Sequence, residues 1–167
     1  MLFRSRDISG FRIQDVAFDM SFSKQFMNFS EGTVTTRLSR AMVPLISFRY
    51  NDPKDMRQIF DSVNMYISSS NSRLDFEDIA YFFPQTRELT GEIDLNGSIS
   101  GTFGDFTGKN IRVDYLDNTR LEFDMRLAGL PSTDSLYMDF DFSGIRTVPS
   151  EFSTLTSGYD LGILHDT

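Results

Sequence analysis

The chain of 167 residues contains no cysteine and no tryptophan, and its single histidine is His165. Without cysteine, disulfide bridges, thiolate catalysis and cysteine-ligated zinc are all excluded, although the absence of thiols does not identify the compartment. His165 stands in a polar tail with no serine or second ligand positioned beside it, which argues against a catalytic triad or a metal site. We therefore expect no cofactor and no enzymatic activity.

Basic side chains are scarce. Sixteen Lys and Arg stand against 24 Asp and Glu, which gives a net charge of −8 and a pI near 4.6. Nucleic-acid binding requires a clustered basic surface that neutralises phosphates, and here the basic residues are scattered among acids. DNA and RNA are therefore not expected as partners.

Long hydrophobic runs are also missing. A membrane helix needs roughly 18 consecutive apolar residues, and no stretch of this chain approaches that length. The first six residues, MLFRSR, lack the apolar core of a signal peptide. If the native protein works outside the cytoplasm, we expect its targeting segment to lie outside these 167 residues.

What the chain has instead is alternation. Within residues 91–103, apolar or glycine side chains occupy every odd position and polar side chains occupy every even one. A period of two predicts a strand with one apolar face and one polar face. The same pattern returns at residues 111–115, 121–127 and 136–142, so the sequence predicts four consecutive strands with one kind of two-faced surface.

The remaining elements are predicted from weaker signals. Residues 11–23 alternate with one phase shift, which predicts either a strand with a bulge near Gln14 and Asp15 or two short strands. Asp52 followed by Pro53 predicts the start of a helix, and Asp75 is a second candidate N-cap. The expected elements are a loop over 24–32, strands over 33–40, 42–50 and 63–69, and short helices over 53–60 and 75–83. Phe152, Leu155 and Tyr159 have spacings that would suit one more helical turn.

The hairpin between residues 111–115 and 121–127 has a predictable loop. Both strands carry their apolar residues at odd positions, and directly paired residues share a face, so the loop must contain an odd number of residues. Leu116, Asp117 and Asn118 satisfy this condition, with Asn118 as the expected left-handed residue. The resulting register pairs Asp114 with Arg120 and Arg112 with Glu122 on the polar face.

Carboxylate pairs on one strand are candidate catalytic groups. Asp139 and Asp141 lie two residues apart on one predicted strand and would point the same way, as a glycosidase pair must. Because they occupy the polar phase of an alternating strand, a solvated outer face explains them better. The Asp75 to Asp78 segment departs from the spacing of an EF-hand calcium loop, and helix capping accounts for its acids.

Alternation alone leaves two architectures open. In a closed β-sandwich the apolar faces of two sheets meet in a dry core. In an open sheet the apolar face stays accessible to a ligand. A sandwich could serve as a carbohydrate-binding or protein-binding module of a secreted or periplasmic protein, with Tyr66, Tyr81 and Tyr137 as candidate contact residues.

Four stretches, in this order, carry a resemblance to a known family. They are DSVNMYI at 61–67, SRLDFEDIAYFFP at 72–84, GEIDLNGSISG at 91–101 and DNTRLEFDMRLAGLP at 117–131. This order is similar to the repetitive periplasmic region of AsmA-like proteins, in particular the TamB type of the translocation and assembly module, as found in Bacteroidota. The resemblance covers about half of the chain.

The resemblance implies an elongated, twisted, mostly antiparallel sheet that curls into an open, taco-like groove, with one or two short helices. It implies that residues 1–167 are one β-groove fragment of a longer periplasmic protein anchored in the inner membrane of a Gram-negative bacterium, with 148–167 a weakly ordered tail or the start of the next repeat. The implied function is outer-membrane biogenesis, through phospholipid transport between the membranes, assembly of β-barrel proteins with an outer-membrane partner, or both.

The open-groove hypothesis makes acyl chains of phospholipids the ligand. Exposed edge strands could also pair, so an edge-to-edge dimer is expected in crystals. The residues predicted to line the apolar groove are Ile93, Leu95, Ile99, Phe103, Ile111, Val113, Tyr115, Leu121, Phe123, Met125, Leu127, Met138, Phe140 and Phe142.

Overall fold

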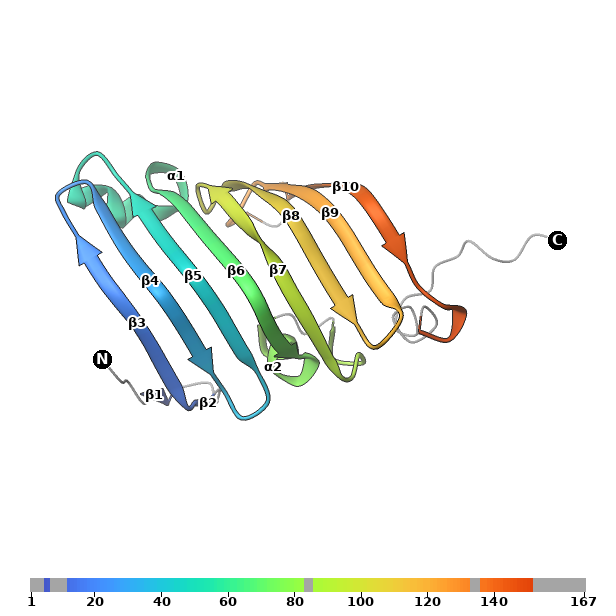
Figure 1. The fold of residues 1–167 in the computed structure, drawn as a ribbon. Helices are drawn as coiled ribbons and strands as arrows, with labels where there is room; N and C mark the ends of the chain where they lie inside the picture. The colour runs from blue at the N-terminus through green and yellow to red at the C-terminus, as the bar shows by residue number, and fades with distance from the viewer. Residues whose placement is uncertain (1–4, 7–11, 83–85, 133–135, 152–167) are drawn as a thin grey trace.

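A computed structural model of the chain describes residues 5–6, 12–82, 86–132 and 136–151. The part of the chain that it describes is mainly β, with eight long strands in one antiparallel sheet and three short helices (Figure 1). The expectation of a mainly β, antiparallel, open sheet is confirmed. Phe152, Leu155 and Tyr159, expected in a helical turn, lie outside the described residues.

The sheet is a simple meander. Each strand pairs with the next one in the chain, so that the order from edge to edge is β10-β9-β8-β7-β6-β5-β4-β3. A separate pair, β1 (Ser5–Arg6) and β2 (Arg12–Ile13), precedes it. The long strands are β3 (Asp15–Phe22), β4 (Phe26–Thr35), β5 (Arg40–Arg49), β6 (Asn64–Asp75), β7 (Glu92–Gly101), β8 (Asp105–Tyr115), β9 (Thr119–Ala128) and β10 (Tyr137–Arg146).

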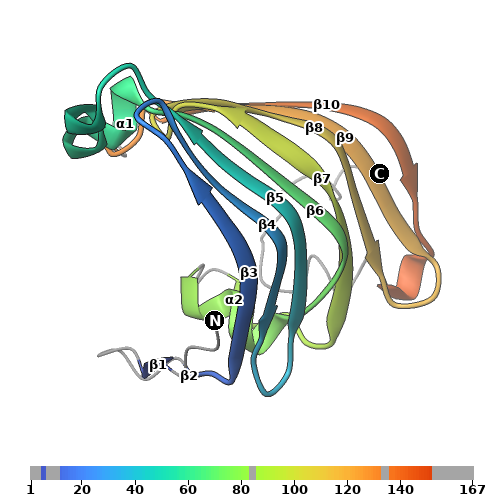
Figure 2. The same cartoon turned by 60° about the vertical axis from the view of Figure 1, so that its left-hand side comes forward.

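The two edge strands do not meet, so the sheet is not closed into a barrel, and among the described residues no second sheet of comparable size faces it. The closed β-sandwich considered from the sequence is therefore wrong for this part of the chain. Figure 2 shows that the long strands bend along their length, which curves the open sheet and places α2 (Phe76–Phe82) on the concave side.

The helices lie at the two ends of the strands, and their capping follows the sequence signals. The 3-10 helix η1 (Pro53–Gln58) continues directly into α1 (Ile59–Ser62). The Asp52 carboxylate accepts a hydrogen bond from the Lys54 amide, and the Asp55 side chain accepts one from the Asp52 amide, which completes a capping box. At α2, the Asp75 carboxylate accepts a hydrogen bond from the amide of Glu77 at 2.7 Å.

The β8–β9 hairpin has the predicted register. Tyr115 pairs with Thr119, so the loop contains the three residues 116–118. The left-handed residue is Leu116, with φ 52°, and not Asn118 as expected. Arg120 donates to Asp114 at 2.5 Å across the pair. Arg112 lies opposite Glu122 but forms its ion pair with Asp114, at 3.3 Å.

A line of backbone irregularities crosses the sheet where the strands bend. Glu31 in β4, Asn71 in β6 and Asn110 in β8 have φ near 50°, and the register of β10 shifts at Ser143. These four positions lie at about the same level of the sheet, on a line that runs from β4 to β10 across the strands between them. We call this line the crease. Because a bulge adds one residue and bends its strand, aligned bulges bend the whole sheet.

Polar groups of the neighbouring strand hold two of these bulges. The Asn71 amide donates to the Asn96 side-chain oxygen at 2.8 Å, and the Asn110 amide donates to an Asp124 carboxylate oxygen at 2.8 Å. The other Asp124 oxygen accepts a hydrogen bond from Lys109 at 2.6 Å. That bond, followed by the one from Asn110, lowers the pKa of the Asp124 carboxyl below its ordinary value.

The strand expected over 33–40 is wrong, because β4 ends at Thr35 and residues 36–39 form the turn before β5. The crease explains the other errors in the predicted strands. Residues 24–32, expected as a loop, mostly belong to β4, and the loop is confined to residues 23–25. The strands predicted over 63–69, 111–115 and 136–142 continue past Asn71, Asn110 and Ser143. Each prediction stopped at a bulge because the alternation changes phase there. The phase shift in 11–23 is a break at Gln14, between β2 and β3.

Few apolar residues are fully buried in the described part of the chain. Val63 and Met65 are buried where α1 meets β6, and Phe76, Ala80 and Tyr115 are buried where α2 packs on β8. The sheet therefore has a small core at each end, under its helices.

Candidate binding surface

Strand β9 shows which residues share a face. It has no residue with positive φ, so its odd-numbered residues Leu121, Phe123, Met125 and Leu127 all point to one side. A residue paired directly with one of these four lies on the same side, and so the register extends this assignment from strand to strand. We call this side the apolar face.

The register brings the predicted residues of β7, β8 and β10 onto this face. Row by row, the partners are Ile93 with Tyr115; Leu95, Val113 and Leu121; Ile99, Gly108, Met125 and Phe140; Ile111, Phe123 and Phe142; and Phe106, Leu127 and Met138.

Phe103 follows β7 in the turn before β8 and joins a row of aromatic rings. Its ring is stacked 6.2 Å from that of Phe48 and lies 6.2 Å from that of Phe60 in α1. Phe48 contacts Phe29 edge-to-face at 6.4 Å, and Phe29 contacts Phe18 at 4.9 Å. The row thus links α1 to strands β5, β4 and β3.

Tyr115 differs from the other predicted residues. Only 2% of its surface is exposed, because the Phe76 ring of α2 packs edge-to-face against it at 5.6 Å. Its hydroxyl donates to the Thr90 carbonyl at 2.9 Å, and burial raises the pKa of the phenol. Tyr115 belongs to the packing under α2, and so it does not line an open surface as expected.

Sequence reasoning missed half of the apolar face. In strands β8 and β10 it missed Phe106 and Ile145, which lie beyond the bulges and outside the predicted ranges. The signal that could have found them is the change of apolar phase at Asn110 and Ser143. The face also continues over the first half of the sheet through Met20, Phe22, Met27, Phe29, Ile46, Phe48, Met65 and Ile67.

The apolar face is half-buried in the middle of the sheet and most exposed at its edges. On β10 the exposed fractions are 44% for Phe140, 49% for Phe142 and 63% for Ile145, and on β3 Phe22 is 74% exposed. Leaving a large apolar side chain in water forfeits roughly 1.5–3 kcal/mol that burial could have gained. Such a surface is suited to a ligand or partner that covers it.

The opposite face is polar and carries cross-strand ion pairs. Arg126 donates to Asp105 through two nitrogens, at 3.1 and 2.8 Å, and this pairing lowers the pKa of the Asp105 carboxyl. Arg73 contacts Glu92 and Asp94, at 3.4 and 3.3 Å. Two of the proposed carbohydrate-contacting residues, Tyr66 and Tyr137, pair with polar-face residues, but they stand on strands β6 and β10, which are not neighbours.

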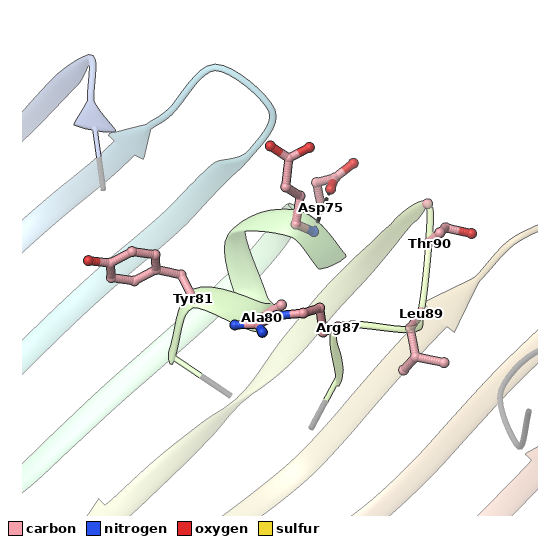
Figure 3. Close-up of a pocket in the computed structure, with 8 residues that line it drawn as sticks. Asp75, Ala80, Tyr81, Arg87, Leu89 and Thr90 are labelled. Atoms are coloured by element: carbon pink, nitrogen blue, oxygen red, sulfur yellow. Dashed lines mark hydrogen bonds between the residues drawn. The ribbon is translucent and has the colours of Figure 1, made fainter. Parts of the chain in front are cut away.

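Hollows in the described residues outside the apolar face are open, and charged side chains share their lining with apolar surface. Figure 3 shows one of about 500 Å³ between α2 and the segment that returns to β7, lined by Asp75, Ala80, Arg87 and Leu89 among others. A second, of about 490 Å³, lies on the polar face at the crease. It gathers Arg40, Asn71, Arg73, Asp94, Asn96, Arg112 and Asp114.

In the described ranges, no group of three or more His, Cys, Asp or Glu side chains is arranged to hold a metal ion. Nor do the described ranges include a helix long and apolar enough to cross a membrane. In comparisons with known proteins, no family model, no curated protein and no solved structure matches this chain.

Proposed function

We propose that the apolar face binds acyl chains of phospholipids, and that the chain is a β-groove segment of an AsmA-like protein of the TamB type. The observation that carries the proposal is one sheet with a continuous apolar face on strands β3–β10, bent along the crease and covered in the described residues only near its two ends. The order of the four sequence stretches supports the family.

The dimensions suit this ligand. Neighbouring strands lie about 4.8 Å apart, so eight strands extend for about 34 Å along the crease. A bilayer core about 30 Å thick holds two acyl chains end to end, which makes one chain about 15 Å long. One chain lying along the crease would therefore cross three or four strands and touch several apolar rows.

In this proposal the native protein lies in the periplasm, with an inner-membrane anchor outside these residues, and serves outer-membrane biogenesis. The apolar face carries phospholipids between the two membranes, assists β-barrel assembly with an outer-membrane partner, or does both. Moving a lipid along a surface breaks no covalent bond, so the proposal needs no catalytic residue and no cofactor.

A retention assay tests the proposal. The purified chain is incubated with vesicles of phosphatidylethanolamine that contain a fluorescent analogue, separated from them, and analysed for bound lipid by fluorescence and native mass spectrometry. Phe140 and Tyr137 supply a matched pair, since both are exposed aromatic residues of β10, but Phe140 lies on the apolar face and Tyr137 on the polar face. We expect Phe140→Asp to weaken retention by about tenfold or more, since burying one Phe is worth roughly 1.5–3 kcal/mol.

The matched control, Tyr137→Asp, should retain lipid as well as the unchanged chain. Phe123→Asp, in the middle of the face, should weaken retention further, provided that circular dichroism shows an intact sheet. If neither the unchanged chain nor its variants retain lipid, or if Phe140→Asp and Tyr137→Asp behave alike, the apolar face is not an acyl-chain surface.

A further inference from the structure

We propose that the outer edge of β10 binds an extended strand of another protein, whose side chains alternate between apolar and basic. This interaction is separate from lipid binding and does not rest on it. Within the described part of the chain, three features of β10 support it: a backbone edge with no partner strand, exposed apolar side chains on one face, and two carboxylates without a direct ion pair on the other.

The outer backbone edge of β10 is open to an added strand. β10 is a ten-residue strand at the end of the sheet, and in the described residues only β9 pairs with it. Every second residue of an edge strand directs its N–H and C=O groups away from the sheet, where an added strand can bond to them. Peptide recognition by strand addition takes its affinity from such bonds and its specificity from alternate side chains.

The apolar side chains of β10 have neighbours on β9 but none on the outer side of the strand among the described residues. Met138, Phe140, Phe142 and Ile145 are 44–63% exposed, whereas their partners on β9 are half-buried between two neighbouring strands. Rings on the next strand inward touch these residues, with Phe123 centred 5.7 Å from Phe140 and 5.3 Å from Phe142. A further strand would provide the missing neighbours if it placed apolar side chains on this side.

The polar side of β10 carries two acids, Asp139 and Asp141, and the cations that interact with them, Arg126 and Lys109, are ion-paired to other carboxylates. Asp139 lies opposite Arg126, but both oxygens of Asp105 already engage that guanidinium. Asp141 lies opposite another acid, Asp124. Neither Asp139 nor Asp141 makes a hydrogen bond or ion pair within the described residues. A strand that places Lys or Arg opposite both would give each acid a direct ion-pair partner.

The same charges disfavour a second copy of this chain as the occupant. If β10 paired antiparallel with β10 of another copy in the register centred on Phe140, Asp139 of each copy would face Asp141 of the other. The other edge strand, β3, presents Asp15 and Asp19 on its polar face, which would also repel β10. The edge-to-edge dimer expected from the sequence is therefore a competing outcome, and the occupant that fits is a basic, amphipathic strand.

The test uses labelled ten-residue peptides with alternating side chains, one of Lys and Val and one of Glu and Val, with binding measured by fluorescence anisotropy at low salt. We expect the Lys and Val peptide to bind at least about tenfold more tightly, since two cross-strand charge pairs change from repulsive to attractive. The double substitution Asp139→Lys and Asp141→Lys should reverse this preference. Equal binding of both peptides, before and after the substitution, would overturn the proposal.

Two further measurements locate the peptide. Because the chain has no cysteine, single cysteines can be placed on the two edges, Ser143→Cys on β10 and Ser21→Cys on β3. A peptide with a terminal cysteine should crosslink to β10 and not to β3. N-methylation of alternate peptide amides, which removes the hydrogen-bond donors along one edge of the added strand, should abolish binding. If N-methylated peptide still binds and only lipid displaces it, the peptide lies on the apolar face, and strand addition is refuted while lipid binding stands.

Sedimentation analysis of the chain alone tests the competing occupant. We expect a monomer whose state is unchanged by the double lysine substitution. A dimer that forms through β10 and excludes the Lys and Val peptide would show that a second copy is the partner, and would overturn the proposal.

Discussion

Replacing Gly97 with alanine should destabilise the sheet at the crease. Gly97 lies in β7 beside the β8 bulge with φ 139°, a conformation that L side chains rarely adopt. An added methyl group would lie 3.0 Å from the Ile111 Cα and 3.2 Å from the Asn110 carbonyl oxygen. These are backbone atoms of the neighbouring strand, and they can move only if the bend of the sheet changes.

The expected magnitude has two parts. Forcing a residue with a side chain into this backbone conformation costs about 1–3 kcal/mol, and overpacking costs about 1–3 kcal/mol more. Gly97→Ala should therefore lower the free energy of unfolding by about 2–6 kcal/mol. The matched control is Gly144→Ala at the β10 end of the crease. The nearest atom to its new methyl group is Glu122 Oε2 at 3.0 Å, the end of a flexible side chain. The control should change stability by less than about 1 kcal/mol.

Urea unfolding followed by circular dichroism measures both variants, with the slope of each transition fitted separately. The reasoning is refuted if Gly97→Ala unfolds within about 0.5 kcal/mol of the unchanged chain, or if Gly144→Ala is the more destabilised of the two. Either result would mean that the backbone at the crease adapts freely, and that the aligned bulges do not fix the bend.

Three further predictions concern hydrogen bonds. The hydrogen bond from Lys109 is the chief cause that lowers the pKa of the Asp124 carboxyl from 3.8, so the ionised carboxyl stabilises the fold fully above pH 3.8, and this contribution is lost as pH falls through the folded-state pKa. Asp124→Asn should therefore make stability depend less on pH on the acid side. Urea midpoints that vary with pH as they do in the unchanged chain would contradict this. Glu151 accepts hydrogen bonds from Thr119 and Asn118, so Glu151→Gln should speed amide exchange at Asn118, where equal rates would show that the contact is dispensable. Tyr115→Phe should cost about 0.5–1.5 kcal/mol in thermal unfolding by removing one buried hydrogen bond, and a larger loss would point to ring packing instead.

The sequence predicted the fold class and the identity of the apolar face in β7–β10, because alternation reports directly which side chains avoid water. It also predicted the length of the β8–β9 loop from parity alone. In that loop the left-handed residue is Leu116 and not Asn118, since local preference for this conformation is weak compared with the demands of the hairpin register. The capping residues Asp52 and Asp75 were found because their signals are local.

What the sequence did not reveal depends on contacts between distant residues. The burial of Tyr115 requires α2 to fold back onto β8, and Phe76 is far from Tyr115 in the chain. The apolar residues of β3–β6 could be assigned to the same face only through the register of the six strand pairs that connect β9 to β3. Strand ends were missed wherever a bulge changed the phase, since a pattern of strict alternation ends there even though the strand does not.

The bend of the sheet and the alternation of its strands constrain each other. A bulge that bends a strand also exchanges its two faces, so the apolar positions must change phase at the same residue. In β8 they are odd-numbered from Tyr115 to Ile111 and even-numbered at Gly108 and Phe106, on either side of Asn110. Without that extra residue, the charged and polar side chains of the first half of β8 would turn onto the apolar face against β9. The phase change therefore encodes the bend: a straight, flat sheet is incompatible with this sequence, whereas a curved sheet keeps one continuous apolar face across the crease.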